Sequence, residues 1–310
     1  AWAWLRERIG PWRVLGLVVG MFGVAVLFWG KVSLRMDSSS LIVSLSVLAV
    51  GNPADFDGDT HADLVWQDAS TRRLTAWTLH ATWRTGTRTF TPGSGAAGWR
   101  AVGSGDAGGD GRPDLLWHNA GTGRLTLWTM NGLTRAAGQS VDTVIDPTWA
   151  SVGSGDFDGD GRDDVLWRDG SGRLSVLLLD GPRGRGVDPL APAAPVDASW
   201  EATGVGDFDD DGRPDVAFRH RLSGRVSVWL MNGLARRQGL LLSPDAPAAG
   251  EWGLAAVADL DGDGLADLLW RNASSQRLVA WLMNGTTRRV GRFLSPAQSP
   301  GAGARLVAPR

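Results

Sequence analysis

Five copies of an Asp-rich segment, about 50 residues apart, constrain this chain more than any other feature of its sequence. The copies begin at Asp55, Asp106, Asp156, Asp207 and Asp259, so successive starts are separated by 51, 50, 51 and 52 residues. A fixed period of this length is typical of architectures built from one repeated supersecondary unit. The sequence therefore predicts an array of five equivalent units.

Each unit has the pattern of consecutive β-hairpins. A short apolar run such as Leu115–His118 is followed by a turn with glycine, Gly121–Gly123, and then by an alternating run, Arg124–Trp128. Alternation on both sides of a glycine turn indicates a hairpin, and Asn131-Gly132 supplies a second hairpin turn. A further strand, marked by a leading Trp such as Trp149, precedes the next loop. Each unit thus contains three clear strands and room for a fourth.

These units predict an all-β fold, a β-propeller of about five four-stranded blades. Gly supplies 43 of the 310 residues, roughly twice its ordinary share, which suits many tight turns. A stacked solenoid is the competing architecture, but a closed ring leaves no exposed sheet edges. Residues 304–308 resemble the leading strand of a sixth unit. They could pair with the first blade and close the ring, or mark where a larger propeller was cut, leaving this chain as a fragment.

The loops follow the pattern D-x-D-x-D-G-x-x-D, which predicts calcium sites. Carboxylates at alternate positions converge within one tight turn, and a hard divalent cation is their natural counter-charge. Oxygen ligands without His or Cys favour Ca²⁺ over zinc or copper. The candidate ligands are Asp55, Asp57, Asp59 and Asp63 in the first loop; Asp106, Asp110 and Asp114 in the second; Asp156, Asp158, Asp160 and Asp164 in the third; Asp207, Asp209, Asp211 and Asp215 in the fourth; and Asp259, Asp261, Asp263 and Asp267 in the fifth.

Two of the five loops depart from the pattern. The first has Thr60 where Gly is expected, and the second has Gly108 in place of the middle Asp. The loops also differ from an EF-hand, because the last carboxylate is at position 9 and the flanking residues alternate as strands. We therefore expect calcium in β-hairpin loops, with the first two sites weaker. Solvated Asp-Gly turns without metal are the alternative interpretation.

The repeats resemble a known family. Asp-Phe-Asp-Gly-Asp-Gly at 156–161, Asp-Val-Leu-Trp-Arg at 164–168 and Trp-Leu-Met-Asn-Gly at 229–233 and 281–285 resemble bacterial VCBS/FG-GAP repeats, which are similar to the blades of integrin α propellers. The resemblance covers residues 51–310. It implies a β-propeller with calcium in its loops, typically at the cell surface and often in adhesion or sugar binding. Family propellers commonly have seven blades, so the five units found here are also consistent with a fragment of a larger propeller.

Residues 1–50 form a separate hydrophobic segment. Residues 14–30 are 17 uncharged residues, roughly 25 Å as a helix, and follow Arg6, Arg8 and Arg13. This order predicts a transmembrane-like helix that anchors the chain in the membrane, with an uncleaved signal peptide as the alternative. The apolar run at 41–50 is too short to span a bilayer, and it could include the first β-strand of the repeats.

The same segment also resembles part of another family. It resembles a fragment of an EamA-type drug/metabolite transporter, and the stretches that carry the resemblance are Trp4–Gly10, Gly16–Gly20, Gly23-Val24 and Leu41–Val50. Such a fragment could not transport a substrate by itself. It implies membrane association or a fused reading frame.

The expected function is a calcium-binding, cell-surface or extracytoplasmic module that binds a glycan or a protein partner. A net charge of -2 and a pI near 6.1 argue against nucleic acid, and the absence of Cys excludes thiol chemistry. No enzyme is expected, because no Ser-His-Asp or metal-His constellation is visible around the four histidines, His61, His80, His118 and His220, which do not recur in register. The recurring Trp residues are expected to pack between blades, and Trp83 lies outside their register. The propeller domain of a polysaccharide hydrolase or lyase, and a fusion without a function of its own, are the alternatives.

Overall fold

The computed structural model describes residues 54–195, 197–247, 251–301 and 303–308. Within these ranges every regular element is a β-strand, and none of the described residues forms a helix suited to crossing a bilayer. The helix expected at 14–30, the transporter-like stretch around it and the apolar run at 41–50 lie outside the described residues.

The described strands form five four-stranded antiparallel units, which are the expected blades; the first and fifth are joined into one eight-stranded sheet by a parallel pairing of Ser295 with Trp83. The first blade contains β1 (Leu64–Asp68), β2 (Leu74–His80), β3 (Trp83–Thr89) and β20 (Ala304–Ala308). The second contains β4 (Trp99–Gly105), β5 (Asp114–Asn119), β6 (Arg124–Asn131) and β7 (Thr134–Val144). The third contains β8 (Ala150–Gly155), β9 (Asp164–Arg168), β10 (Leu174–Asp180) and β11 (Arg183–Pro189). The fourth contains β12 (Trp200–Gly206), β13 (Asp215–His220), β14 (Val226–Asn232) and β15 (Ala235–Leu241). The fifth contains β16 (Trp252–Ala258), β17 (Asp267–Asn272), β18 (Arg277–Asn284) and β19 (Thr287–Gln298).

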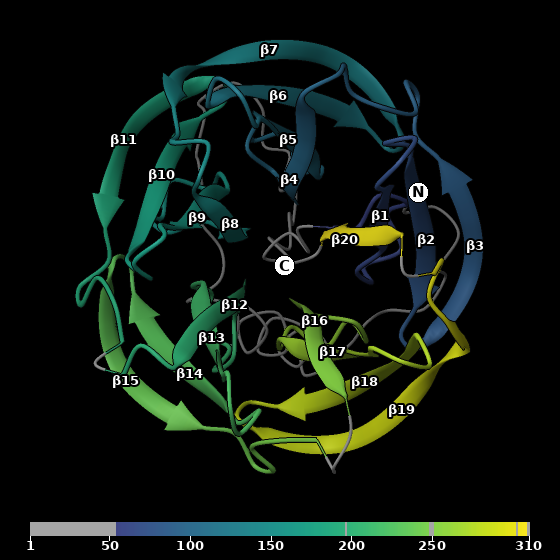
Figure 1. Cartoon of the computed structure of the whole chain (residues 1–310), viewed down its shortest axis with the longest axis vertical. Helices are drawn as coiled ribbons and strands as arrows, with labels where there is room; N and C mark the ends of the chain where they lie inside the picture. Colours follow the sequence, from purple (N-terminus) through teal and green to yellow (C-terminus); the bar gives the residue numbers. More distant parts are fainter. Residues whose placement is uncertain (1–53, 196, 248–250, 302, 309–310) are drawn as a thin grey trace, which may run out of the picture. The chain divides into compact units, whose positions relative to one another are not determined.

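The blades are arranged as a ring (Figure 1). Their innermost strands β20, β4, β8, β12 and β16 each contact the next, and β16 contacts β20. The strand β20 is antiparallel to β1, with Leu306 opposite Trp66. Of the two roles considered for residues 304–308, the structure shows the pairing with the first blade. The innermost strand of that blade therefore comes from the C-terminal part of the sequence.

The core lies between neighbouring blades and is lined by the recurring Trp residues. Four of them, on the second strands, are at most 1% exposed: Trp66, Trp117, Trp167 and Trp270. Each of the other four, on the third strands, is at most 7% exposed: Trp77, Trp128, Trp229 and Trp281. Buried clusters combine residues of adjacent blades, which explains why these positions repeat. Trp83, outside this register, is 63% exposed at the start of β3.

The Asn-Gly turns fix how one blade lies against the next. Gly132, Gly233 and Gly285 adopt left-handed φ angles of 57°, 59° and 60°. A Cβ atom at Gly233 would lie 3.2 Å from the carbonyl oxygen of Phe157, in the Asp-rich loop of the preceding blade. Glycine is needed here for both the turn and the close approach. These turns therefore pack against the loops that carry the candidate metal ligands.

Candidate metal centres

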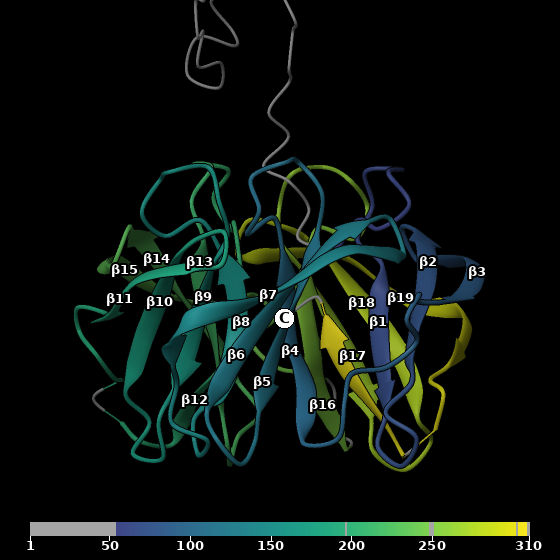
Figure 2. The ribbon, with the colours of Figure 1, turned by 90° about the horizontal axis from the view of Figure 1, so that it is seen from above.

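The five Asp-rich loops lie at one end of the ring. Each connects the innermost strand of its blade to the second strand, so all five emerge at the upper edge of the ring in Figure 2. In the first blade the loop precedes β1. Backbone hydrogen bonds link some loops directly, as from the Asp163 N–H to the Asp106 carbonyl at 3.0 Å and from the Ala266 N–H to the Asp207 carbonyl at 2.7 Å. The Ala62 N–H donates the same bond to the Asp259 carbonyl at 3.2 Å, so three of the five neighbouring pairs are linked in this way. Pro113 and Pro214 stand at the equivalent position of the remaining two pairs and cannot donate such a bond.

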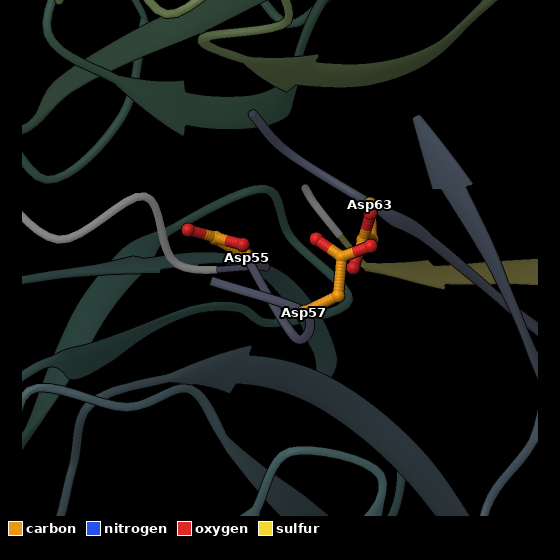
Figure 3. A group of neighbouring side chains, drawn as sticks. All are labelled: Asp55, Asp57 and Asp63. Carbon is orange, nitrogen blue, oxygen red and sulfur yellow. The ribbon is translucent and has the colours of Figure 1, made fainter. Parts of the chain in front are cut away.

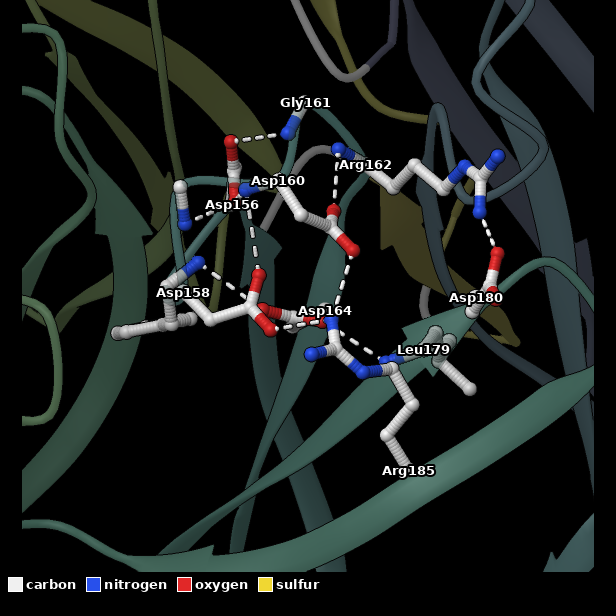
Figure 4. Close-up of polar contacts among 11 residues, drawn as sticks. Asp156, Asp158, Asp160, Gly161, Arg162, Asp164, Leu179, Asp180 and Arg185 are labelled. Carbon is white, nitrogen blue, oxygen red and sulfur yellow. Dashed lines mark hydrogen bonds and ion pairs between the residues drawn. The ribbon is translucent and has the colours of Figure 1, made fainter.

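The first Asp of each loop is the acceptor around which the backbone folds. In the third loop, Oδ1 of Asp156 accepts the Gly159 N–H at 2.7 Å and the Asp160 N–H at 3.1 Å. Its Oδ2 accepts the Gly161 N–H at 2.8 Å (Figure 4). Corresponding bonds hold the other four loops. A tight turn of this sequence therefore places its other carboxylates close together.

The last Asp of each loop links the loop to the third strand of its blade. Asp164 accepts the Phe157 N–H at 3.0 Å with Oδ2 and the Leu179 N–H at 2.8 Å with Oδ1. Asp63, Asp215 and Asp267 make the same two bonds in their blades. In the second loop, Asp114 bonds to Gly108 and Met130. All five of these Asp side chains are buried.

Burial makes ionisation of these carboxyl groups costly. Desolvation is the largest cause and raises the pKa of Asp63, Asp164 and Asp267 to about 8, that of Asp215 to about 7 and that of Asp114 to about 6. Neighbouring carboxylates add to the rise, and the two backbone N–H donors oppose it. A bound divalent cation would favour the charged form and lower these pKa values.

We expect the stability of the protein in chelator to fall by more than about 1 kcal/mol as the pH rises from 5 to 8. A carboxyl group with a raised pKa binds its proton more tightly in the folded state. Its contribution is fully present below the unfolded-state pKa of 3.8 and is lost progressively as the pH rises from there through the folded pKa. Calcium should reduce the fall because it replaces the proton as counter-charge. Urea unfolding at each pH measures this.

Asp267→Asn is the matched variant for this experiment. The amide cannot ionise at this position, so the pH dependence in chelator should become shallower. A wild-type protein whose stability in chelator rises from pH 5 to 8 would contradict the expectation.

Four loops bring three carboxylates together. In each group, one oxygen of every member lies within 4.8 Å of the others. The groups are Asp55, Asp57 and Asp63 (Figure 3); Asp156, Asp158 and Asp164; Asp207, Asp209 and Asp215; and Asp259, Asp261 and Asp263.

The remaining candidates are arranged differently. Asp59, Asp160 and Asp211 lie outside these groups, and each accepts the backbone N–H of the residue two positions later. The fifth loop differs, because its group of three carboxylates includes Asp263 and leaves out Asp267. Among the described residues, Asp106, Asp110 and Asp114 of the second loop form no such group.

The donor set fits a hard cation such as Ca²⁺. All the candidate side-chain ligands in the four groups are carboxylate oxygens. Oδ1 of Asp261 is buried and has no hydrogen-bond partner among the described residues. A buried carboxylate oxygen without a donor is costly, and a cation at the fifth loop would satisfy it.

The first loop folds like the others despite its Thr. Thr60 adopts φ of 76°, close to the 85° of Gly161 at the same position. A β-branched residue in this region is strained by roughly 1–3 kcal/mol. The first loop therefore keeps its geometry at a cost, and its carboxylates still converge.

Sequence reasoning missed two groups of residues at the loops. Arg185, Arg237 and Arg289 on the outermost strands form ion pairs with loop carboxylates. They stand five residues after the first residue of the second hairpin turn, which is a recurrence visible in the sequence. The side chain of His61 packs against His80 with ring centroids 4.3 Å apart. It also borders Gly262 of the fifth loop.

Together, the ring of blades and the Asp-rich loop between the first two strands of each blade define a β-propeller with candidate cation loops. The chain belongs to the FG-GAP-like repeat family, whose model matches residues 55–117, 109–167, 156–218 and 207–270. A comparison with curated protein sequences found no match.

Three solved structures have similar folds at low identity. The Tc holotoxin pore of Photorhabdus luminescens is 17% identical with a TM-score of 0.43, and the match covers 77% of this chain and 11% of that one. A protein of unknown function from Bacteroides caccae is 10% identical with a TM-score of 0.40, covering 74% and 72%. A luciferin-regenerating enzyme is 10% identical with a TM-score of 0.37, covering 74% and 64%. Similarity at this level says nothing about what the chain binds.

Proposed function

We propose that this protein is a calcium-stabilised, extracytoplasmic propeller that binds a glycan, with a surface protein as the other class of ligand. The observation that carries the calcium part is the set of four groups of three carboxylates in equivalent loops. A site repeated in four of the five blades suits a structural ion, because catalysis needs one centre and not four copies. Extracellular calcium modules bind the ion with dissociation constants of about 0.1–1 mM, which suits the calcium concentration outside the cytoplasm.

A pocket at the fifth blade supports the glycan part. It has a volume of about 170 Å³ and is lined by Pro247, Trp252, Trp270, Val279, Trp281 and Arg288. Indole faces stack on the apolar faces of sugar rings, and a guanidinium donates hydrogen bonds to hydroxyl or carboxylate groups. Trp252 is only partly buried, unlike Trp270 and Trp281 beside it.

A glycan array followed by calorimetry, in 1 mM calcium and again in chelator, tests this proposal. We expect saturable binding of a glycan without turnover, weakened at least about tenfold by Trp252→Ala because the indole platform is lost. Trp200→Ala is the matched control, since Trp200 begins β12 as Trp252 begins β16.

Other outcomes separate the alternatives. Equal loss of binding in both Trp variants would place the glycan elsewhere. If the protein binds a surface protein and no glycan, the proposal of a glycan ligand is wrong. Turnover of a polysaccharide that is lost on changing one unrepeated acid would favour a hydrolase or lyase.

A further inference from the structure

The outer hairpin of each blade contains a β-bulge at the same place, close to its turn. In the third blade, Leu178 pairs with Gly186 and Leu179 with Gly184, so Arg185 has no partner in the register. The same shift leaves one residue unpaired in each of the remaining four blades: Thr85, Ala136, Arg237 and Arg289. A bulge turns the side chain of the extra residue away from the regular alternation. The five bulge residues are therefore structurally equivalent.

Where the bulge residue is arginine, it contacts the Asp-rich loop of its own blade. The Nη1 atom of Arg185 lies 2.7 Å from Oδ2 of Asp158 and 2.8 Å from Oδ2 of Asp160 (Figure 4). Both carboxylates belong to the alternating Asp positions of the loop. The guanidinium thus occupies one side of the carboxylate cluster.

The fourth and fifth blades repeat this contact. Arg237 pairs with Asp209 and, at 3.3 Å, with Asp211. Arg289 pairs with Asp261 in the fifth blade, and its Nη1 atom lies 3.4 Å from Asp263. Three of the five loops therefore contain an internal cation at the same two positions.

The first and second blades lack this cation in different ways. In the second, Ala136 is the bulge residue and Gly108 replaces the middle Asp, so the loop has lost the arginine and one of its two acidic partners and keeps Asp110. In the first, Thr85 is the bulge residue and its hydroxyl lies 2.8 Å from the Thr78 hydroxyl. Asp57 and Asp59 are both retained. The first loop therefore has the full set of acids without an arginine at the bulge, and Arg88 acts on Asp57 only electrostatically, with no ion pair among the described residues.

A guanidinium and a divalent cation neutralise the same carboxylates, and each repels the other at short range. We infer that Arg185, Arg237 and Arg289 are built-in counter-ions that compete with calcium. The first loop, with Asp55, Asp57 and Asp63, is then the site that binds calcium most tightly, in contrast to the weaker site that its Thr60 led us to expect. The inference rests on the proposed calcium binding and adds which loops depend on the ion.

Two opposite variants of the full chain test the inference, each studied by calcium calorimetry and by thermal unfolding in chelator and in calcium. Arg237→Met should strengthen calcium binding at one site at least about tenfold and lower the melting temperature in chelator, because the fourth loop loses its internal cation. Thr85→Arg should weaken the tightest site at least about tenfold. Arg183→Met is the control: Arg183 is on β11, forms no ion pair among the described residues, and its change should leave binding as in the wild type.

The outcomes distinguish this inference from the calcium proposal. Weaker or unchanged calcium binding by Arg237→Met overturns the competition, even when the wild type binds calcium normally. A wild type without calcium binding refutes the calcium proposal, and the inference then survives only if Arg237→Met gains a site. If Thr85→Arg fails to fold, Arg237→Met and the equivalent Arg289→Met still decide.

Discussion

Ending the chain at Gly303 should abolish the cooperative unfolding of the propeller. The truncation removes β20, which supplies the innermost strand of the first blade and pairs with β1. Leu306 and Val307 are 5% and 0% exposed, and burial of each contributes about 1.5–3 kcal/mol. The truncation also leaves β1 as an unpaired edge and opens the ring. The combined loss approaches the whole net stability of a typical domain, about 5–15 kcal/mol.

Thermal unfolding followed by circular dichroism and light scattering measures this effect. A point variant isolates the closure from the truncation: Leu306→Asp places a charge in the cluster that joins the first and fifth blades and should cost several kcal/mol. Leu222→Asp is the matched control, because Leu222 is 89% exposed and its change should be nearly neutral. Full cooperativity in the truncated chain would show that the ring does not depend on its closing strand.

Removing calcium should lower the melting temperature, and the size of the decrease should increase with the number of loops that hold an ion. With a dissociation constant of about 0.1 mM, 1 mM Ca²⁺ stabilises the fold by about 1.4 kcal/mol per site. Occupancy of the first loop alone gives that value, and occupancy of all four carboxylate groups gives about 6 kcal/mol. For a domain of this size the larger value corresponds to roughly 10–20 °C.

The same titration should change the Trp emission, because the blade interfaces that bury Trp loosen when the loops do. Magnesium should restore stability poorly, since it requires a tighter octahedral shell and gives up water reluctantly. An unmoved melting temperature and an unmoved emission after chelation would leave the loops as solvated turns, held by their backbone hydrogen bonds alone.

The repeat period and the hairpin signals were enough to predict the blades, because strand alternation and turn glycines are local properties of the sequence. The candidate ligands followed from the Asp spacing for the same reason: a nine-residue loop brings its own carboxylates together. The second loop illustrates how local this is. Gly108 in place of the middle Asp predicted a weaker site, and among the described residues this loop forms no group of three carboxylates.

Other features depend on contacts between distant residues and could not be read from the pattern. The last Asp of each loop was predicted as a ligand, yet it also accepts the N–H of a residue on the third strand, as Asp164 does from Leu179. The bulge arginines were missed because a bulge shifts the register by one residue, and the alternation alone does not reveal which side chain it redirects.

The sequence by itself determined that the chain is made of β-blades with acidic loops, because the repeat period, the turn residues and the spacing of the carboxylates are all properties of the linear sequence. Only the tertiary structure decided that Ala304–Ala308 close the ring against β1, and that Arg185 reaches the loop formed by Asp156–Asp164 while Thr85 takes the place of that arginine at the first loop. The physical reason is that these outcomes depend on which strands pair and where the pairing shifts. Hydrogen bonds between strands set both, over distances along the chain that no local pattern spans.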